Sequence, residues 1–242
     1  MAEVILSKRL QALAEMVTPG RRVVDVGCDH GFVSIYLVQK GISPRVLAMD
    51  VRKGPLSRAQ EHIAESGLSE YIETRLSDGL IEYQEGEAES LICAGMGGRL
   101  MMKILTESCL KAKGLEELIL QPQSELPAFR KFLRDEGYRL LDENIIWEEG
   151  KYYFLMKVCY AGQENEEQSD AQKCDRELTD RFGEFLLQRR SPLLKQYLQD
   201  TLCNMRQIES SLVCNENERA RERLKEVQQE IEILERALSI FD

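Results

Sequence analysis

The feature that most restricts the fold is an alternation of short, β-rich apolar runs with longer amphipathic runs, which continues to about residue 160. Alternation of this kind is typical of a doubly wound α/β sheet with helices on both faces. The predicted strands are 22–26, 45–50, 72–76, 90–94 and 117–121. The predicted helices are 4–17, 32–39, 54–65, 98–110 and 125–136.

Two further extended runs, 138–147 and 152–160, are joined by a Glu-Glu-Gly-Lys turn. No segment between them is long enough for a helix, so they are predicted to form an antiparallel hairpin. Parallel strands closed by such a hairpin are the order of a Rossmann-like sheet, and ligands bind such sheets outside the carboxyl ends of the strands.

The last third of the chain has a different pattern. The polar run 161–170 is predicted to be part of a linker, which gives a Rossmann-like domain at 1–160, a linker at 161–175 and a helical domain at 176–242. Ser191 and Pro192 are typical of a helix start. Apolar residues then recur at alternating steps of four and three at 194, 198, 201, 205, 208 and 212, and again at 220, 224, 227, 231, 234 and 238. The repeats predict an antiparallel coiled-coil hairpin, which serves either as a packing arm or as a substrate arm.

Several classes of protein are disfavoured. No apolar run reaches the roughly 18 residues of a membrane span, and the N-terminus lacks a secretory signal, so we expect a cytoplasmic protein. Seven cysteines without a C-x-x-C pair indicate reduced thiols. With only two histidines, a metal site is not expected.

The net charge of −10 is unevenly distributed. Residues 1–60 carry a net charge of +4, whereas 61–120 and 121–180 carry −7 and −6. A polyanion is therefore expected to meet the ends of the chain rather than its middle.

The first predicted strand leads into the turn Asp-Val-Gly-Cys-Asp-His-Gly at 25–31. A dinucleotide fingerprint requires glycine where the chain has Asp29 and Phe32, so that match fails. The turn fits better the acidic-x-Gly-x-Gly-x-Gly loop of enzymes that use S-adenosylmethionine, with Asp29 in place of the middle glycine. A carboxylate there is suited to face the sulfonium cation, and the alternative is that Asp29 only caps the following helix.

The other strand ends carry polar or glycine-rich residues. Asp50 ends the second strand, where a carboxylate can bind two ribose hydroxyls. The third ends in Ser-Asp-Gly at 77–79, the fourth in Ala-Gly-Met-Gly-Gly at 94–98 and the fifth in Gln-Pro-Gln at 121–123. The fourth segment lacks the Asn-Pro-Pro or Asp-Pro-Pro run of enzymes that methylate exocyclic amines, which favours attack by a ring nitrogen.

Together these motifs, with Leu-Ile-Leu-Gln-Pro-Gln at 118–123 and Gly-Lys-Tyr-Tyr at 150–153, resemble the bacterial tRNA adenine-N1-methyltransferase family TrmK. The resemblance implies a class I methyltransferase fold and S-adenosylmethionine-dependent methylation of the adenine at position 22 of tRNA. It maps the family's key aspartate onto Asp29. Relatives often have Ala-Tyr where this chain has Gly31 and Phe32, so no tyrosine hydroxyl is expected there.

We expect Asp29 to be the catalytic residue, supporting the cation that develops on an extruded adenine. The predicted cofactor-binding residues are Asp25, Gly27, Cys28, His30, Gly31, Asp50, Val51, Asp78, Gly79, Ala94, Gly95 and Met96. The predicted substrate-binding residues are Gly97, Gly98, Gln121, Pro122, Gln123, Lys8, Arg9 and Arg52. Two alternatives stay open: a methyltransferase for a small molecule or protein, and a non-catalytic RNA-binding or scaffold protein. No metal, membrane or partner protein is predicted.

Overall fold

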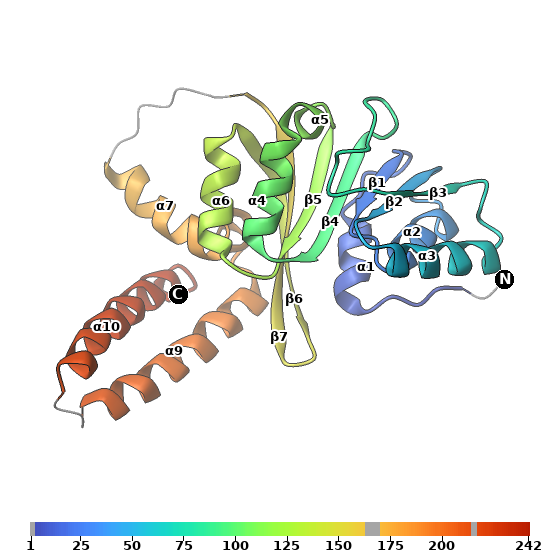
Figure 1. Cartoon of the computed structure of the whole chain (residues 1–242). Helices are drawn as coiled ribbons and strands as arrows, with labels where there is room; N and C mark the ends of the chain where they lie inside the picture. The colour runs from blue at the N-terminus through green and yellow to red at the C-terminus, as the bar shows by residue number, and fades with distance from the viewer. Residues whose placement is uncertain (1–2, 163–169, 214–216) are drawn as a thin grey trace. The chain divides into compact units, whose positions relative to one another are not determined.

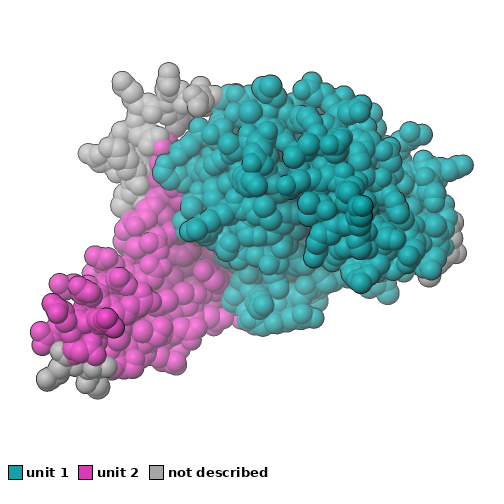
Figure 2. All heavy atoms as spheres, in the orientation of Figure 1, with its two compact units in different colours: residues 1–166 teal, residues 167–242 magenta. Residues whose placement is uncertain are grey.

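A computed structural model describes residues 3–162, 170–213 and 217–242 of the chain. It divides into two compact units, Met1–Glu166 and Glu167–Asp242, which are coloured separately in Figure 2. Most of the predicted linker, residues 163–169, lies outside the described residues. Helix α7 (Asp170–Phe182) already occupies the end of the range predicted as linker.

The first unit is built on one seven-stranded sheet with the order β3-β2-β1-β4-β5-β7-β6 (Figure 1). Its strands are β1 (Val23–Val26), β2 (Val46–Asp50), β3 (Ile72–Leu76), β4 (Ser90–Met96), β5 (Glu117–Pro122), β6 (Tyr138–Glu148) and β7 (Lys151–Tyr160). Neighbours among β1 to β5 pair in parallel, whereas β7 runs antiparallel to β5 and β6. The predicted parallel sheet closed by a hairpin is therefore confirmed.

The helices of this unit are α1 (Lys8–Glu15), α2 (Phe32–Gln39), α3 (Lys53–Glu65), α4 (Gly98–Glu107), α5 (Cys109–Lys113) and α6 (Leu126–Asp135). The first begins four residues later than predicted because Ser7 caps it, its Oγ accepting the Leu10 N–H at 3.4 Å. The predicted helix 98–110 is two helices, since the backbone at Ser108 leaves the helical region (φ −116°, ψ 36°).

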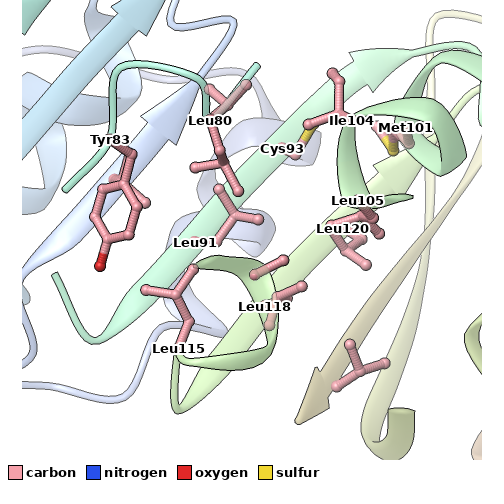
Figure 3. Close-up of a cluster of buried hydrophobic side chains, with 14 of the residues drawn as sticks. Leu80, Tyr83, Leu91, Cys93, Met101, Ile104, Leu105, Leu115, Leu118 and Leu120 are labelled. Atoms are coloured by element: carbon pink, nitrogen blue, oxygen red, sulfur yellow. The ribbon is translucent and has the colours of Figure 1, made fainter. Parts of the chain in front are cut away.

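Buried side chains form a cluster on each face of the sheet. On one face, Met101 and Ile104 of α4 pack with Leu118 and Leu120 of β5 (Figure 3). On the other, α1, α2 and α3 cover strand residues that include Ile119. Strands buried on both faces read as continuous apolar runs, as the sequence does here. Strands β1, β2 and β5 are buried along their length, so a ligand can reach this central part of the sheet at the strand ends.

The second unit is helical. Besides α7 it contains α8 (Glu184–Gln188), α9 (Pro192–Val213) and α10 (Glu218–Ser239), and α9 and α10 pack against each other. The predicted start at Ser191 and Pro192 is confirmed, and Asn217 caps α10 by accepting the Ala220 N–H at 2.7 Å. The predicted apolar repeat of α9 is not buried along its whole length. Leu194 is buried, whereas Ile208 is 37% exposed. A helical arm is thus established, and its coiled-coil geometry remains a prediction.

Within the described ranges, no helix is long and apolar enough to span a bilayer.

Candidate active site

The turn between β1 and α2 has an unusual backbone. Gly27, Asp29 and Gly31 all have positive φ, at 77°, 47° and 75°. Positive φ is readily adopted by glycine and is tolerated by aspartate better than by most other residues. The turn is also held to the neighbouring strand, because the N–H groups of Gly27 and Cys28 donate to the Met49 carbonyl at 2.8 and 3.0 Å. Asp29 is therefore presented on a fixed, strained backbone.

Both glycines of the turn are also required by contacts within the protein. A Cβ on Gly27 would overlap Met96 Cε, and a Cβ on Gly31 would lie 3.1 Å from Ala59 Cβ. Met96, from the end of β4, lies over Gly27, so the turn and the end of β4 are in contact.

The side chain of Asp29 is 61% exposed, and His30 Nε2 lies 3.8 Å from its Oδ1. The His30 backbone is held by α3, since its carbonyl lies 2.9 Å from His62 Nδ1. A carbonyl oxygen only accepts, so Nδ1 of His62 carries the proton in this contact. The His62 ring stacks on Phe32 with centroids 4.7 Å apart. Through these contacts His62 supports the turn that carries Asp29.

Cys28 is buried in the same turn. Burial, together with the nearby Asp25 carboxylate, raises the pKa of its thiol well above the usual range. The thiol is therefore protonated at neutral pH and unsuited to act as a nucleophile.

Two aspartates at the ends of neighbouring strands are almost completely buried, at 4% exposure each. Asp25 accepts a hydrogen bond from Ser34 Oγ at 2.7 Å. Burial, and to a smaller extent the charge of Asp50, raises the pKa of Asp25 to about 6, although the Ser34 hydrogen bond opposes the shift. Asp50 accepts the Arg52 N–H at 2.8 Å through Oδ1. This carboxylate is thus fixed at the carboxyl end of β2, where the acceptor for the ribose hydroxyls is predicted.

The raised pKa of Asp25 predicts a specific pH dependence. The unfolded carboxyl titrates near 3.8 and the folded one near 6, so the folded state binds this proton more tightly. Its contribution to stability is therefore full below about pH 4 and is lost as pH rises through about 6, a change of about 3 kcal/mol. Asp25→Asn replaces the titrating carboxyl group with an amide. Between pH 4 and about pH 6, the free energy of unfolding of the variant, measured in urea, should rise relative to that of the wild type. A difference between the two proteins that does not change between pH 4 and 7 would contradict the assignment.

A second group of contacts joins the ends of β4 and β5 to helix α1. Gln121 is completely buried, and its Oε1 accepts both the Gly95 N–H at 3.2 Å and Arg9 Nη1 at 2.7 Å. The Arg9 guanidinium also lies over the Tyr153 ring, 5.1 Å from its centroid. Gln121 therefore links β5 to α1 inside the protein and is not part of an exposed polar edge. The guanidinium of Arg9, predicted to bind substrate, makes its hydrogen bond within the protein.

The glycine segment after β4 is closely packed. Gly98 donates to Ser124 Oγ at 3.2 Å, and a Cβ there would lie 2.5 Å from the Ser124 carbonyl oxygen. The Gln123 N–H donates to the Met96 carbonyl at 2.8 Å, while its side chain is exposed. Of the predicted Gln-Pro-Gln edge, only Gln123 is accessible, because Pro122 is buried with Gln121.

The remaining predicted site residues differ in exposure. Among them Gly79 is buried and packs against Ile104. Ala94 is half-buried, and Gly97 is exposed. The exposed side chains are Asp78, Val51, Arg52 and Lys8. In the part of the chain that the structure describes, no group of three His, Cys, Asp or Glu side chains is placed to hold a metal ion.

The geometry fits a sulfonium cofactor with an adenosine group. The edge carries an anchored carboxylate at Asp50 and exposed carboxylates at Asp29 and Asp78. Gly31, the N-cap residue of α2, supplies no side-chain cap, so the first N–H groups of the helix face the turn. Carboxylates can accept ribose and amine hydrogens and can balance the charge of a sulfonium.

Comparison with known proteins agrees with this fit. The family model described as "Methyltransferase domain" matches residues 6–156. The tRNA (adenine(22)-N(1))-methyltransferase of Bacillus subtilis is 32% identical over 98% of this chain and 99% of its own length. The crystal structure of the B. subtilis m1A22 tRNA methyltransferase TrmK has a TM-score of 0.81 at 30% identity, covering 98% of this chain and 100% of that one. A Streptococcus pneumoniae structure in complex with S-adenosyl-L-methionine has a TM-score of 0.81 at 32% identity, covering 97% and 100%.

A sheet of this order, with a glycine turn after β1 and an acidic residue at the end of β2, defines a class I methyltransferase that uses S-adenosylmethionine. The similarity extends over the helical unit as well as the sheet. The chain belongs to the tRNA (adenine(22)-N(1))-methyltransferase family.

Proposed function

We propose that this chain transfers the methyl group of S-adenosylmethionine to N1 of the adenine at position 22 of tRNA, in the cytoplasm. The observation that carries the proposal is the similarity to the B. subtilis enzyme over almost the full length of both chains. A relative that shared only the cofactor-binding sheet would not support a common substrate, because that sheet serves many acceptors.

The residues at the strand ends support attack by a ring nitrogen. Neutral adenine N1 has an in-plane lone pair, so it can attack without prior loss of a proton. The segment Ala94–Gly98 offers glycine and methionine in place of the polar side chains that an exocyclic amine would need. What the protein must supply is in-line positioning of N1 and the methyl carbon. S-adenosylmethionine supplies a methyl group activated by its sulfonium charge.

Asp29 is proposed to act on the charge that develops during transfer. As the methyl group moves, positive charge passes to the adenine ring, and its N6–H becomes a stronger donor. The exposed Asp29 carboxylate is available to accept that N6–H and to stabilise the cation. Asp50 is proposed to hold the ribose hydroxyls of the cofactor, and Gly97 and Gln123 to border the adenine.

N1 lies on the Watson–Crick edge, so a paired adenine would have to leave its helix to reach the site. We therefore propose that the base is extruded. Backbone phosphates would then meet Lys8 and Arg52, both of which are exposed at this edge.

The test is methylation of an unmodified tRNA transcript. Incubation with the protein and S-adenosylmethionine should create a reverse-transcription stop at position 22, because a methyl group on N1 blocks pairing. The matched control is the same transcript with adenine 22 replaced by guanine, which should lose the stop. Cofactor binding without any methylation of RNA would favour a small-molecule or protein substrate, and absence of cofactor binding would favour a scaffold.

A further inference from the structure

The β6–β7 hairpin extends past the edge at which the parallel strands end. In the register of β5 with β7, Leu118 pairs with Val158 and Leu120 with Met156. Continued to Pro122, where β5 ends, this register reaches Phe154, and the hairpin runs three residues further to Lys151. At about 3.3 Å per residue the tip lies about 10 Å beyond β5. Figure 1 shows this projection. The tip therefore borders the edge where the adenine is proposed to bind.

The tip is a rigid support. Its turn has two residues, Glu149 and Gly150, both with positive φ (49° and 78°), which matches the tight type I′ turn of regular hairpins. Immediately behind the closing pair, Trp147 and Tyr152 lie opposite each other with ring centroids 4.3 Å apart. Ile145 and Phe154, the next pair on that face by strand alternation, are buried.

Trp147 nevertheless remains 42% exposed. A large aromatic ring held near the tip of a hairpin at the edge of an active site presents a flat apolar surface at low cost in conformational entropy. The charges of the tip residues Glu148, Glu149 and Lys151 sum to −1. The adjacent Arg9, whose N–H donates to Glu148, directs its guanidinium to Gln121, so the tip does not favour contact with phosphate. The chemistry that fits is stacking of an unpaired nucleobase, which depends on a π face and little on charge.

We propose that Trp147, supported by Tyr152, stacks on a base of the RNA that flanks the extruded adenine. This inference rests on the proposed function, since it requires an RNA substrate at this edge. It assigns Trp147 to substrate binding and leaves the transfer step to residues at the ends of β1 and β4.

The chain itself supplies the probe, because Trp147 is its one tryptophan. The wild-type protein is titrated with unmodified tRNA transcript in the presence of S-adenosylhomocysteine, and tryptophan fluorescence is recorded. Stacking predicts saturable quenching that follows the binding curve from filter retention. Binding to the filter without any change in fluorescence would overturn the proposal.

A variant pair tests the effect on turnover. Trp147→Ala should raise the KM for tRNA by about 10- to 100-fold, with kcat and S-adenosylmethionine affinity within a few-fold of wild type. Trp147→Phe should recover most of the loss. The matched control is Tyr71→Ala, which removes a ring of similar exposure (48%) next to the opposite, amino-terminal end of β3 and should leave KM unchanged.

The salt dependence of KM distinguishes base stacking from a contact with phosphate. The KM ratio of Trp147→Ala to wild type should be constant between low and high salt, whereas a lost phosphate contact would give a ratio that falls with salt. Equal KM values for Trp147→Ala and Tyr71→Ala would overturn the proposal while the reverse-transcription stop still stood. A wild type that bound tRNA with quenching but gave no stop would instead overturn the proposed function.

Discussion

Replacing Asp29 with alanine is expected to lower the single-turnover rate of adenine methylation by about 10²- to 10³-fold. The carboxylate lies at the apex of the turn after β1 and is 61% exposed, so it can meet the substrate without rearrangement of the core. Because Asp29 is proposed to face the charge that appears only as the methyl group moves, its loss should affect turnover more than binding. The affinity for S-adenosylmethionine, measured by calorimetry, should change by no more than about threefold. Equal losses of both would mean that Asp29 belongs to the cofactor loop.

The backbone at Asp29 requires a matched control. Its φ of 47° is unfavourable for alanine, so some loss could come from strain alone. Asp29→Asn tolerates this conformation and keeps an acceptor oxygen, but removes the charge. If Asp29→Asn is partly active, the activity that it still lacks relative to the wild type is assigned to the lost charge. If both variants are inactive and have normal melting temperatures, the whole loss is assigned to the charge.

The largest effect on stability is expected for Glu117, which is completely buried at the start of β5. It accepts hydrogen bonds from the Thr18 N–H at 2.8 Å and from Ser90 Oγ at 2.8 Å, and it pairs with Lys157 at 2.9 Å and Arg21 at 2.7 Å. Burial alone would raise the pKa of Glu117, but these partners hold it below its ordinary value. The residue joins the loop after α1 to β4 and β7.

Glu117→Ala would leave Lys157 without a buried counter-ion. Removal of one partner of a buried pair costs about 3–5 kcal/mol, which corresponds to a melting temperature lower by roughly 6–20 °C for a chain of this size. The control is the neighbouring Glu116→Ala, which removes a carboxylate that also pairs with Arg21, at 2.8 Å, but is 58% exposed. That variant should lose at most about 1 kcal/mol. Similar melting curves for the two variants would contradict the role of Glu117.

The fold could be predicted from the sequence because its signals are local and repeated. Buried strands produce unbroken apolar runs, and β3 and α2 have the predicted bounds. The errors are at helix ends. The start of α1 depends on one hydroxyl, that of Ser7, and the break at Ser108 depends on how α4 and α5 pack; periodicity reports neither.

The site was predicted less completely, because its contacts join residues far apart in the chain. The edge on which the motifs meet follows from parallel strands, and the structure brings Gly27 and Met96 into contact. No pattern indicated that Arg9, 112 residues before Gln121, would bond to it, or that Gln121 would be buried. The exposure of Trp147 could likewise not be predicted from the sequence, because it depends on how far the hairpin projects beyond β5.

The reversal of strand order between β1 and β4 has a consequence for how such enzymes diversify. Residues proposed to hold the methyl donor come largely from β1, β2 and β3, whereas the proposed frame for the acceptor comes from β4, β5 and the hairpin on the other side of the reversal. Mutations can therefore remodel one half while the chemistry of the other persists. Met96 crosses this divide to cover Gly27, so a change there would be felt by donor and acceptor together.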